Sequence, residues 1–342
     1  MRDSKGGNME NIYNKTKEEL KTSFEKAYRA NQVFDWLYKQ RIKDLSEINN
    51  MKRGMVEFII ENFYMETVHL ETMQSDKDVN KFLFKLHDGN HVEAVLMHHD
   101  YGNSLCVSTQ VGCNMGCRFC ESGRLKKKRN LEPYEMVTQI LKVEEEMDLR
   151  ISHIVIMGIG EPFDNFENVM KFIDIINDNN GLAIGARHIT VSTCGVVPKI
   201  DAFAELPKQV NLAISLHAPN DALRNKLMPI NKAYNLKMLM DSIKRYVMKT
   251  NRRVTFEYIL LSGINDSKEH AIELSELIRG INCYVNLIPY NTTSHNAFQK
   301  SDKTMQFYDI LKKRKINVTI RKEFGSKVDA ACGQLRASYE EE

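Results

Sequence analysis

Apolar and polar residues follow two different periodicities along the chain, and these divide it into regions. From residue 15 to about 65 apolar residues recur at helical spacing, which predicts a set of helices. Between about 67 and 100 apolar and polar residues alternate on both sides of Asp88-Gly89. Alternation interrupted by such a turn predicts a β-hairpin.

From about residue 104 short apolar strands alternate with amphipathic helices. Repeated βα units of this kind build a parallel sheet or barrel, and in such barrels the chemistry sits at the C-terminal ends of the strands. The predicted strands are Leu105–Val107, His153–Met157, His188–Val191, Val210–Ile214, Val254–Tyr258, Tyr284–Ile288 and Asn317–Ile320. The predicted helices between them include Pro133–Met147 and Asn235–Lys249.

Composition limits the class of protein. The chain has 342 residues, 42% hydrophobic and 27% charged, as expected of a globular protein with one large domain and an appendage, or with two domains. It contains no run of eighteen apolar residues and no apolar N-terminal leader, so we expect a cytoplasmic protein that does not span a membrane. The net charge of +3 permits a nucleic-acid partner without requiring one.

Three of the seven cysteines stand in one short run, Cys113, Cys117 and Cys120. An odd cysteine count in a reducing compartment favours metal binding or catalysis over disulfides. The spacing C-x3-C-x2-C resembles that of radical S-adenosylmethionine (SAM) enzymes, in which three thiolates hold a [4Fe–4S] cluster and leave one iron open to SAM. The alternatives are a chance group of buried thiols, or a zinc site completed by His98 and His99.

Polar residues recur at the ends of four successive predicted strands. Glycine lets the backbone approach a ligand closely, and a carboxylate after such a turn can accept hydrogen bonds from an ammonium group. Helix capping would explain one of these residues but not the whole set. The segments are Gly158-Ile159-Gly160-Glu161-Pro162, Ser192-Thr193-Cys194-Gly195, Ser215-Leu216-His217 and Asn291.

Two further cysteines are candidates for chemistry. Cys332 lies in a loop of small residues near the C-terminus, and Cys106 lies seven residues before Cys113. We interpret them as a nucleophile and a resolving thiol, although each could also be a small buried apolar residue. For Cys194 and Cys283 we favour the buried interpretation. Basic groups that could hold phosphate are 126–129, Arg252-Arg253 and 312–315.

The chain resembles the RlmN/Cfr family of radical SAM RNA adenosine methyltransferases. The resemblance runs from about Arg29 to Ala337. Pro162 and Pro289 are similar to RlmN, whereas Cfr-like sequences tend to carry Ala and Arg at these positions. The matching segments are Arg29–Trp36, Val92-Glu93, Cys106–Cys113, Arg129–Leu131, Gly158–Pro162, Ser215–Asn220, Met228–Asn231, Asn286–Pro289 and Asp329–Leu335.

The resemblance implies a fold and a set of cofactors. The fold is α/β, a radical SAM partial (βα) barrel at 101–342 with an N-terminal helical accessory RNA-binding domain at 1–66 and a connecting β-hairpin at 67–100. The cofactors are one [4Fe–4S] cluster on Cys113, Cys117 and Cys120, and SAM, two molecules per turnover. The residues implied to bind SAM are Gly160, Glu161, Ser192, Ser215, Leu216, His217 and Asn291.

The resemblance also implies an activity, which is methylation of adenosine carbon 2 in the peptidyl-transferase loop of 23S rRNA and beside the anticodon of some tRNAs. Cys332 becomes S-methylcysteine, Glu93 acts as a base, and Cys106 resolves the RNA adduct and leaves a Cys106–Cys332 disulfide. An electron donor such as flavodoxin or ferredoxin is expected, and the chain is expected to be a monomer.

Other functions remain open at this stage. One is a Cfr-like methyltransferase acting on carbon 8. A second is a non-catalytic iron–sulfur RNA-binding protein, against which the pair Cys106 and Cys332 argues because a structural cluster needs neither thiol. A third is a radical SAM enzyme acting on a peptide or small molecule. Two residues depart from the family pattern, Glu121 in place of a small residue and Cys194 in place of serine.

Overall fold

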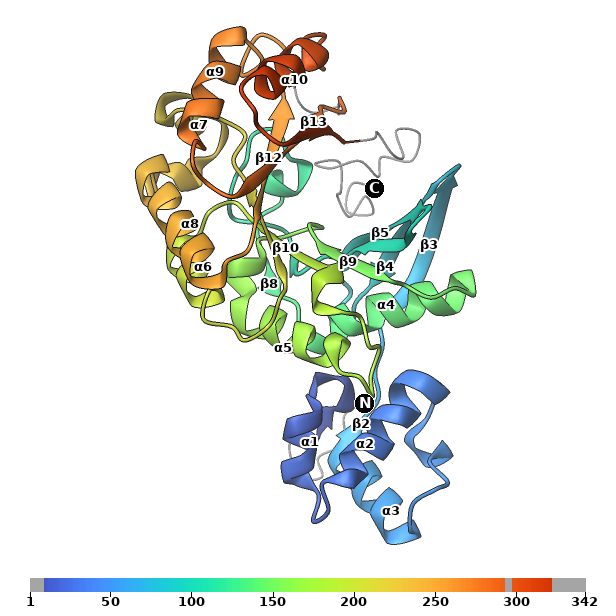
Figure 1. Cartoon of the computed structure of the whole chain (residues 1–342). Coiled ribbons are helices and arrows are strands. Elements are labelled where there is room, and N and C mark those ends of the chain that lie inside the picture. Colours follow the sequence, from blue (N-terminus) through green and yellow to red (C-terminus); the bar gives the residue numbers. More distant parts are fainter. Residues whose placement is uncertain (1–8, 293–296, 322–342) are drawn as a thin grey trace.

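A computed structural model describes residues 9–292 and 297–321 of the chain. A curved sheet with helices on its outer side forms the larger part of the molecule, and a group of short helices near the N-terminus lies at one end of it (Figure 1). Cys332 lies outside the described residues.

The sheet contains ten strands in the order β14-β13-β12-β11-β10-β9-β6-β5-β4-β3. The seven strands from β14 to β6 are parallel, and β5, β4 and β3 continue the sheet in antiparallel fashion. The sheet therefore forms an open, partial barrel with β14 and β3 at its edges. The bounds are β3 (His69–Asp76), β4 (Val79–Lys85), β5 (His91–His99), β6 (Gly102–Cys106), β9 (His153–Ile156), β10 (Ile189–Thr193), β11 (Asn211–Ser215), β12 (Val254–Leu260), β13 (Cys283–Pro289) and β14 (Val318–Ile320).

The structure confirms the predicted α/β fold, and a strand forms at each predicted position after residue 104. Helix α4 (Pro133–Met147) has the predicted bounds, and α8 (Leu236–Thr250) is shifted by one residue from the prediction. The predicted hairpin is present as β4 and β5, but the sequence did not reveal β3. This edge strand contains no buried residue, so it lacks the apolar alternation by which a half-buried strand is recognised.

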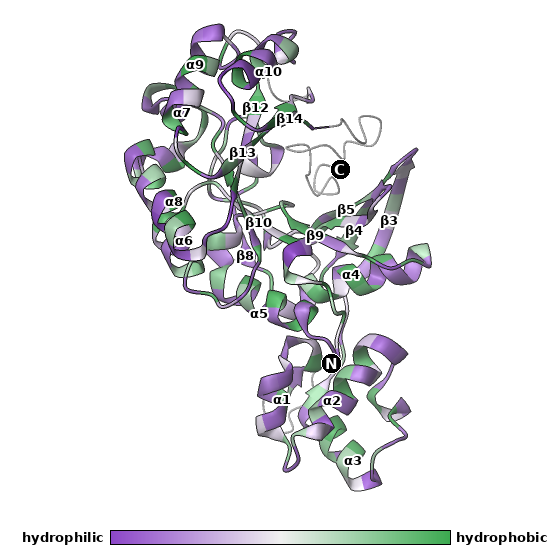
Figure 2. Ribbon diagram, viewed as in Figure 1, coloured by the Kyte–Doolittle hydropathy of each residue, from purple (hydrophilic) through white to green (hydrophobic). Residues whose placement is uncertain are grey.

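Helices cover the outer face of the parallel strands. Because these strands are covered on one face and line the barrel with the other, they read as nearly continuous apolar runs. Helices α6 (Val197–Phe203) and α8 carry both hydrophilic and hydrophobic residues, as expected of helices with one apolar face (Figure 2). The other outer helices are α5 (Phe166–Asn177), α7 (Asp221–Leu227), α9 (Lys268–Leu277) and α10 (Thr304–Lys313). No helix in the described ranges is long and apolar enough to cross a membrane.

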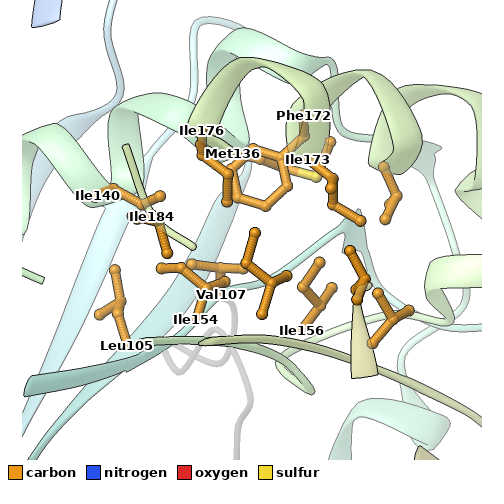
Figure 3. Packing of buried hydrophobic residues seen from close by; sticks show 14 of the residues in the cluster. Leu105, Val107, Met136, Ile140, Ile154, Ile156, Phe172, Ile173, Ile176 and Ile184 are labelled. Carbon is orange, nitrogen blue, oxygen red and sulfur yellow. The ribbon is translucent and has the colours of Figure 1, made fainter. Parts of the chain in front are cut away.

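The largest apolar core lies between the sheet and these helices. Figure 3 shows side chains of β6 and β9 facing those of α4 and α5. Burying each such side chain contributes about 1.5–3 kcal/mol, so this core fixes the strands whose ends carry the site. The labelled core residues, none more than 3% exposed, are Leu105, Val107, Met136, Ile140, Ile154, Ile156, Phe172, Ile173, Ile176 and Ile184.

The N-terminal segment is helical, as predicted, and contains α1 (Lys17–Ser23), α2 (Tyr28–Asp35) and α3 (Arg53–Asn62). Thr16 and Glu19 form a capping box at the start of α1, which satisfies amide groups that have no partner within the helix. Lys17 is 2.8 Å from Asp178, and Lys171 is 2.6 Å from Glu19. These ion pairs connect the N-terminal helices to the barrel. A two-stranded parallel pair, β1 (Glu10–Asn11) and β2 (Phe63–Tyr64), connects the two ends of the segment.

Candidate active site

A cavity opens inside the barrel at the C-terminal ends of the parallel strands. Its wall combines the loop that carries the three clustered cysteines with the ends of β9, β10, β11 and β12. The predicted site residues in this wall are Cys106, Cys113, Cys117, Cys120, Gly160, Glu161, Ser192, Ser215 and His217. Three predicted residues, Glu93, Leu216 and Asn291, do not line it, and Cys332 lies outside the described residues.

The cysteine loop is closed by backbone hydrogen bonds at its base. It leaves β7 (Gln110–Val111), passes η4 (Glu121–Arg124) and returns as β8 (Arg129–Asn130), which is paired with β7. The Cys113 N–H donates to the Leu125 carbonyl over 2.8 Å. Gly112 has a φ of +73°, and a Cβ there would lie 2.3 Å from a backbone oxygen. Only glycine fits this position, so the base of the loop is tightly specified.

The three loop thiols lie together in an apolar environment. Burial raises the pKa of Cys113 to about 12, and it also raises the pKa values of Cys117 and Cys120. The charge of Cys120 raises the pKa values of Cys113 and Cys117 further, so the group becomes thiolate when a cation balances it. The Gly123 and Ser122 amides hydrogen-bond to Cys120, as expected around an iron–sulfur ligand. These residues fit a [4Fe–4S] cluster.

The arrangement differs from a mononuclear metal site. Within the described ranges, no three His, Cys, Asp or Glu side chains are grouped to hold a single metal ion. A cluster places its cysteines on different irons, so its ligands do not need to meet at one point. His98 bonds through both ring nitrogens to Asn103 and Asn80 and lies near the start of β6, whereas Cys106 ends that strand. His98 and His99 therefore do not complete a zinc shell with the cysteine loop.

Glu161 follows β9 and faces the cavity, although only 4% of it is exposed. Its Oε1 accepts from the Phe163 amide over 3.0 Å, and its Oε2 accepts from the Cys194 amide over 2.8 Å. Burial raises the pKa of this carboxyl, and the hydrogen bonds oppose that effect. A carboxylate oxygen has more than one acceptor position, so Glu161 can still receive a ligand ammonium group.

A row of polar side chains crosses the inside of the barrel. Ser192 Oγ lies 3.4 Å from Ser215 Oγ, Ser215 pairs in register with Glu257, and Asn286 donates to Glu257 over 2.9 Å. Burial raises the pKa of Glu257, while Arg321 and Asn286 lower it. The sequence analysis missed Glu257. A single carboxylate within the apolar strand β12 was the available signal.

His217 adopts a left-handed backbone conformation with a φ of +56°, which is strained for a residue with a side chain. Its Nδ1 accepts from the Ile259 amide over 3.0 Å, and Asn265 donates to its carbonyl over 2.9 Å. Burial, followed by the charge of Arg224, lowers the pKa of His217 to about 3. The ring is therefore neutral, and its proton is on Nε2 because Nδ1 is an acceptor.

Cys106 and Glu93 lie on neighbouring strands, β6 and β5, where the parallel and antiparallel parts of the sheet meet. Cys106 is opposite Val95 in register, and Glu93 lies on the same face of β5 as Val95 because side chains alternate. Lys81 Nζ lies 3.3 Å from Glu93 Oε1, and these residues are only 7% and 1% exposed. The sequence analysis did not identify Lys81, whose signal was a cation in the interior of the mostly apolar strand β4.

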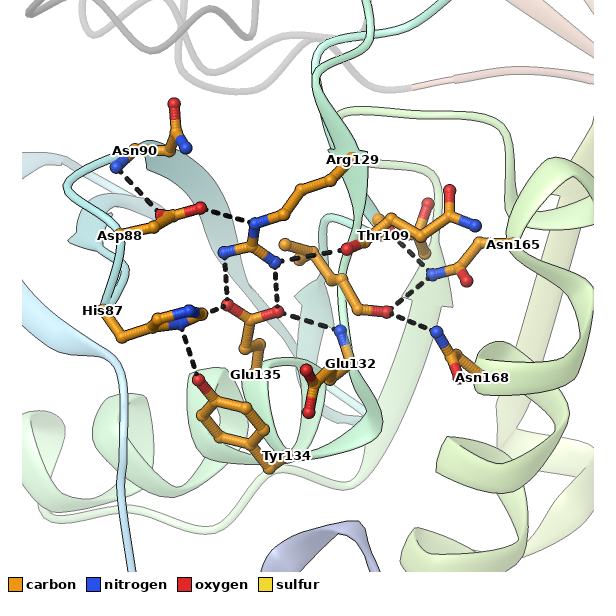
Figure 4. Close-up of polar contacts among 12 residues, drawn as sticks. His87, Asp88, Asn90, Thr109, Arg129, Glu132, Tyr134, Glu135, Asn165 and Asn168 are labelled. Carbon is orange, nitrogen blue, oxygen red and sulfur yellow. Dashed lines mark hydrogen bonds and ion pairs between the residues drawn. The ribbon is translucent and has the colours of Figure 1, made fainter. Parts of the chain in front are cut away.

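The basic group at 126–129, next to the cysteine loop, is largely engaged by the protein's own acids. Arg129 donates to both oxygens of Glu135 over 2.7 Å and to Asp88 over 2.6 Å (Figure 4). Lys127 contacts Asp164 over 2.7 Å. Among these four residues, Lys126 and Lys128 are exposed, whereas Arg129 is held in its ion pairs. Cys194 and Cys283 are buried, as predicted.

Comparison with known proteins first defines the class. Residues 107–275 match the Radical SAM superfamily, and residues 10–61 match the ribosomal RNA large subunit methyltransferase N-terminal domain. The crystal structure of a radical SAM methyltransferase from Sphaerobacter thermophilus is 40% identical with a TM-score of 0.90, and the match covers 96% of this chain and 99% of that one. The protein is a radical SAM methyltransferase, a class that uses SAM and a [4Fe–4S] cluster.

Curated relatives define the family within that class. The chain is 54% identical to the probable dual-specificity RNA methyltransferase RlmN of Spiroplasma citri, over 97% of this chain and 99% of the relative. It is 52% identical to the corresponding protein of Enterococcus faecalis, over 96% of both chains. The chain belongs to the RlmN family of RNA methyltransferases. The predicted family is therefore confirmed, and the Cfr alternative is not favoured.

Proposed function

We propose that this enzyme methylates carbon 2 of an adenosine in the peptidyl-transferase loop of 23S rRNA, and of an adenosine beside the anticodon in some tRNAs. The observation that carries the proposal is the position of Cys106, whose thiol shares one cavity with the three loop cysteines. The names of the relatives, which describe dual-specificity RNA methyltransferases, support two RNA substrates. Pro162 and Pro289 support carbon 2.

Cys113, Cys117 and Cys120 are proposed to hold the cluster, and the strand ends are proposed to bind SAM. When bound, the cluster supplies the electron for reductive cleavage, and SAM, two molecules per turnover, supplies the methyl group and the hydrogen-abstracting radical. Glu161 accepts from an ammonium group, and His217 donates through Nε2. Ser192 and Ser215 offer hydroxyl groups in the cavity wall. Leu216 is fully buried, so it contributes through its backbone, and Asn291 follows β13.

The protein's own thiols and carboxylate carry the remaining steps. Adenine carbon 2 has no acidic proton, so polar methyl transfer to it is not available. Cys332 holds the methyl carbon as a thioether and remains linked through it to the adenine ring. Once this adduct has given one electron back to the cluster, Glu93 removes the proton that carbon 2 still carries. The Cys106 thiolate then attacks the Cys332 sulfur, and the bond from that sulfur to the methylene carbon breaks with its electron pair going to the base. The methylene carbon takes up a proton to become the methyl group, and a disulfide is left. A thiol reductant restores the Cys106–Cys332 pair for the next turnover.

The N-terminal helices are proposed to contact RNA as an accessory domain, with 67–100 connecting them to the barrel. The bases to be modified must be unstacked to enter a cavity at the barrel mouth, so the target is a loop nucleotide. We further propose a cytoplasmic monomer that receives electrons from a flavodoxin or ferredoxin.

Mass spectrometry of RNA tests this function. The rRNA and tRNA of cells with and without the gene are digested to nucleosides, and 2-methyladenosine is resolved from 8-methyladenosine. We expect 2-methyladenosine to disappear from both RNA pools when the gene is removed, and to return with the wild-type gene but not with a Cys332→Ala gene. Loss of 8-methyladenosine instead would contradict the assignment to carbon 2.

A further inference from the structure

A fully buried guanidinium group lies beside the candidate site. Arg224 is on α7 and has no exposed surface. Its Nη2 donates to the Cys194 carbonyl over 2.6 Å and to the Ser215 carbonyl over 3.2 Å, and its Nε donates to the Leu216 carbonyl over 3.2 Å. Its Nη1 donates to the Asn231 side-chain oxygen over 2.9 Å. Arg224 therefore connects the ends of β10 and β11, where the predicted SAM-binding residues lie.

These contacts solvate the charge of Arg224 but do not neutralise it. Its hydrogen bonds go to three backbone carbonyls and one amide oxygen rather than to a carboxylate. The Asp221 carboxylate acts on it only by its charge, because no hydrogen bond joins the two side chains and Asp221 accepts from Asn231 over 2.8 Å instead. Burying a cation without an anionic partner is costly. An anion absent from the polypeptide itself would offset that cost.

The cysteine loop is the part of the molecule that lies against α7. The Arg118 amide donates to the Leu227 carbonyl over 3.0 Å. Leu227 and Met228 belong to one apolar cluster with Cys194, and Cys117 and Cys120 pack against that cluster. Arg224 donates to the Cys194 carbonyl, so its guanidinium group lies against the same apolar cluster that Cys117 and Cys120 contact. The acid at this place is Glu161, which accepts from the Cys194 amide.

We propose that Arg224 is a positioning residue that raises the reduction potential of the cluster bound by the cysteine loop. The inference rests on the proposed function only in that Cys113, Cys117 and Cys120 hold the cluster. An iron–sulfur cluster with three thiolates is anionic, and reduction adds one more negative charge. A fixed buried cation stabilises the reduced form more than the oxidised form, and the low dielectric strengthens this effect. Each nitrogen of the guanidinium group donates to the protein, so Arg224 is proposed to act on the cluster through its charge.

The test is a redox titration of the reconstituted cluster, followed by electron paramagnetic resonance without SAM or RNA. Arg224→Gln is expected to lower the midpoint potential so that the reduction equilibrium falls at least tenfold, which is about 59 mV for one electron. Arg224→Lys, which keeps the charge, is expected to stay closer to wild type than to Arg224→Gln. The matched control is Arg245→Gln, because Arg245 is an exposed arginine that pairs with Asp201 over 2.7 Å. It is expected to have the wild-type potential.

A second variant covers the case in which Arg224→Gln does not retain a cluster. Asn231→Asp/Asp221→Asn exchanges the amide and the carboxylate of a hydrogen-bonded pair. A carboxylate then lies at the oxygen that Nη1 contacts, so it neutralises the guanidinium without removing it. This double variant is also expected to lower the potential. Cluster-loaded Arg224→Gln, or in its place the double variant, with an unchanged potential would overturn the inference. The measurement uses no RNA, so an error in the assigned methylation position would leave its result unaffected. Both the proposed function and this inference require that the Cys117→Ala variant does not bind the cluster.

Discussion

Replacing Arg129 with methionine tests the ion-pair network at the base of the cysteine loop. Arg129 connects three elements, since its own strand β8 pairs with β7, Glu135 is on α4, and Asp88 is in the turn between β4 and β5. The change removes two parallel hydrogen bonds of 2.7 Å to Glu135 and one of 2.6 Å to Asp88. Met keeps most of the side-chain volume, so the charge is the main loss.

The structure sets the size of the expected effect. The Glu135 side chain has no exposed surface, and leaving one member of a buried ion pair uncompensated costs about 3–5 kcal/mol. Glu135 keeps the Glu132 amide as a donor at 2.8 Å, and Arg129 is itself 26% exposed. Both facts place the cost near the lower limit, about 3 kcal/mol. Because β8 closes the cysteine loop, Arg129→Met is also expected to retain less iron after reconstitution.

Urea unfolding followed by circular dichroism measures the cost, with Lys126→Met as the control. Lys126 is an exposed cation three residues earlier, and its loss is expected to change the free energy of unfolding by less than about 0.5 kcal/mol. The double variant Arg129→Met/Glu135→Gln is expected to recover at least half of the loss, because no buried charge is then left without its partner. A single-variant cost below about 1 kcal/mol, or a double variant no more stable than Arg129→Met, would refute the reasoning.

The same variant changes how stability depends on pH. Burial opposes ionisation of Asp88, but hydrogen bonds from Arg129 and Asn90 outweigh it and hold the pKa of Asp88 well below its usual range. A carboxyl with a lowered pKa in the folded protein contributes stability above about pH 4, and this stability is lost as the pH falls further. Wild-type protein is therefore expected to lose more stability than Arg129→Met between pH 5 and pH 3, roughly the range set by that pKa.

Three further predictions concern the candidate site. Cys106→Ala is expected to accumulate a covalent protein–RNA adduct, which is seen on a denaturing gel with labelled RNA, whereas Cys332→Ala is expected to form none. If cluster-loaded Cys106→Ala forms no adduct, Cys106 is not the resolving thiol. Gly160→Ala is expected to weaken SAM binding at least tenfold in equilibrium dialysis. The backbone at this residue has a φ of +113°, and an added Cβ would lie 2.7 Å from the Gln110 Cβ, so the loop would have to shift. An unchanged SAM affinity would contradict the idea that the packing of Gly160 against Gln110 sets the SAM site. In folded protein without its cluster, Cys113 is expected to react with iodoacetamide at pH 8 more slowly than in the unfolded chain, because burial raises the pKa of the thiol to about 12. Peptide mass spectrometry measures the two rates, and equal rates would contradict the raised pKa.

The parts of the fold that were predictable from the sequence are those whose periodicity reflects burial. The parallel strands and α4 have apolar patterns set by a core on one side and a cavity on the other, so their positions could be predicted closely. Strand β3 is at the edge and contains no buried residue. Its pairing with β4 depends on backbone hydrogen bonds, which leave no pattern in the side chains.

The candidate site, like the fold, could be predicted from the sequence only in part. Cys113, Cys117 and Cys120 are close in the sequence, so their spacing alone indicated a shared cofactor. Arg224 and Lys81 were missed because a buried charge has the same letter as an exposed one, and only the fold shows that Lys81 lies inside the sheet. The resemblance supplied Glu93 and Cys106 separately, whereas the register of β5 with β6 puts Cys106 opposite Val95, on the same face of the sheet as Glu93.

The change of strand direction between β5 and β6 limits how this protein can vary during evolution. Glu93 is on the antiparallel side of that boundary, and the predicted cofactor groups are on the parallel side. Inserting or deleting one residue within β5 would turn Glu93 to the opposite face of the sheet, while the cysteine loop and the strand ends would keep their places. Length changes in homologues should therefore collect in the turns on either side of β4, or occur two residues at a time. A lineage that broke this rule would keep the cysteine loop and the strand ends and lose the carboxylate that we propose as the base.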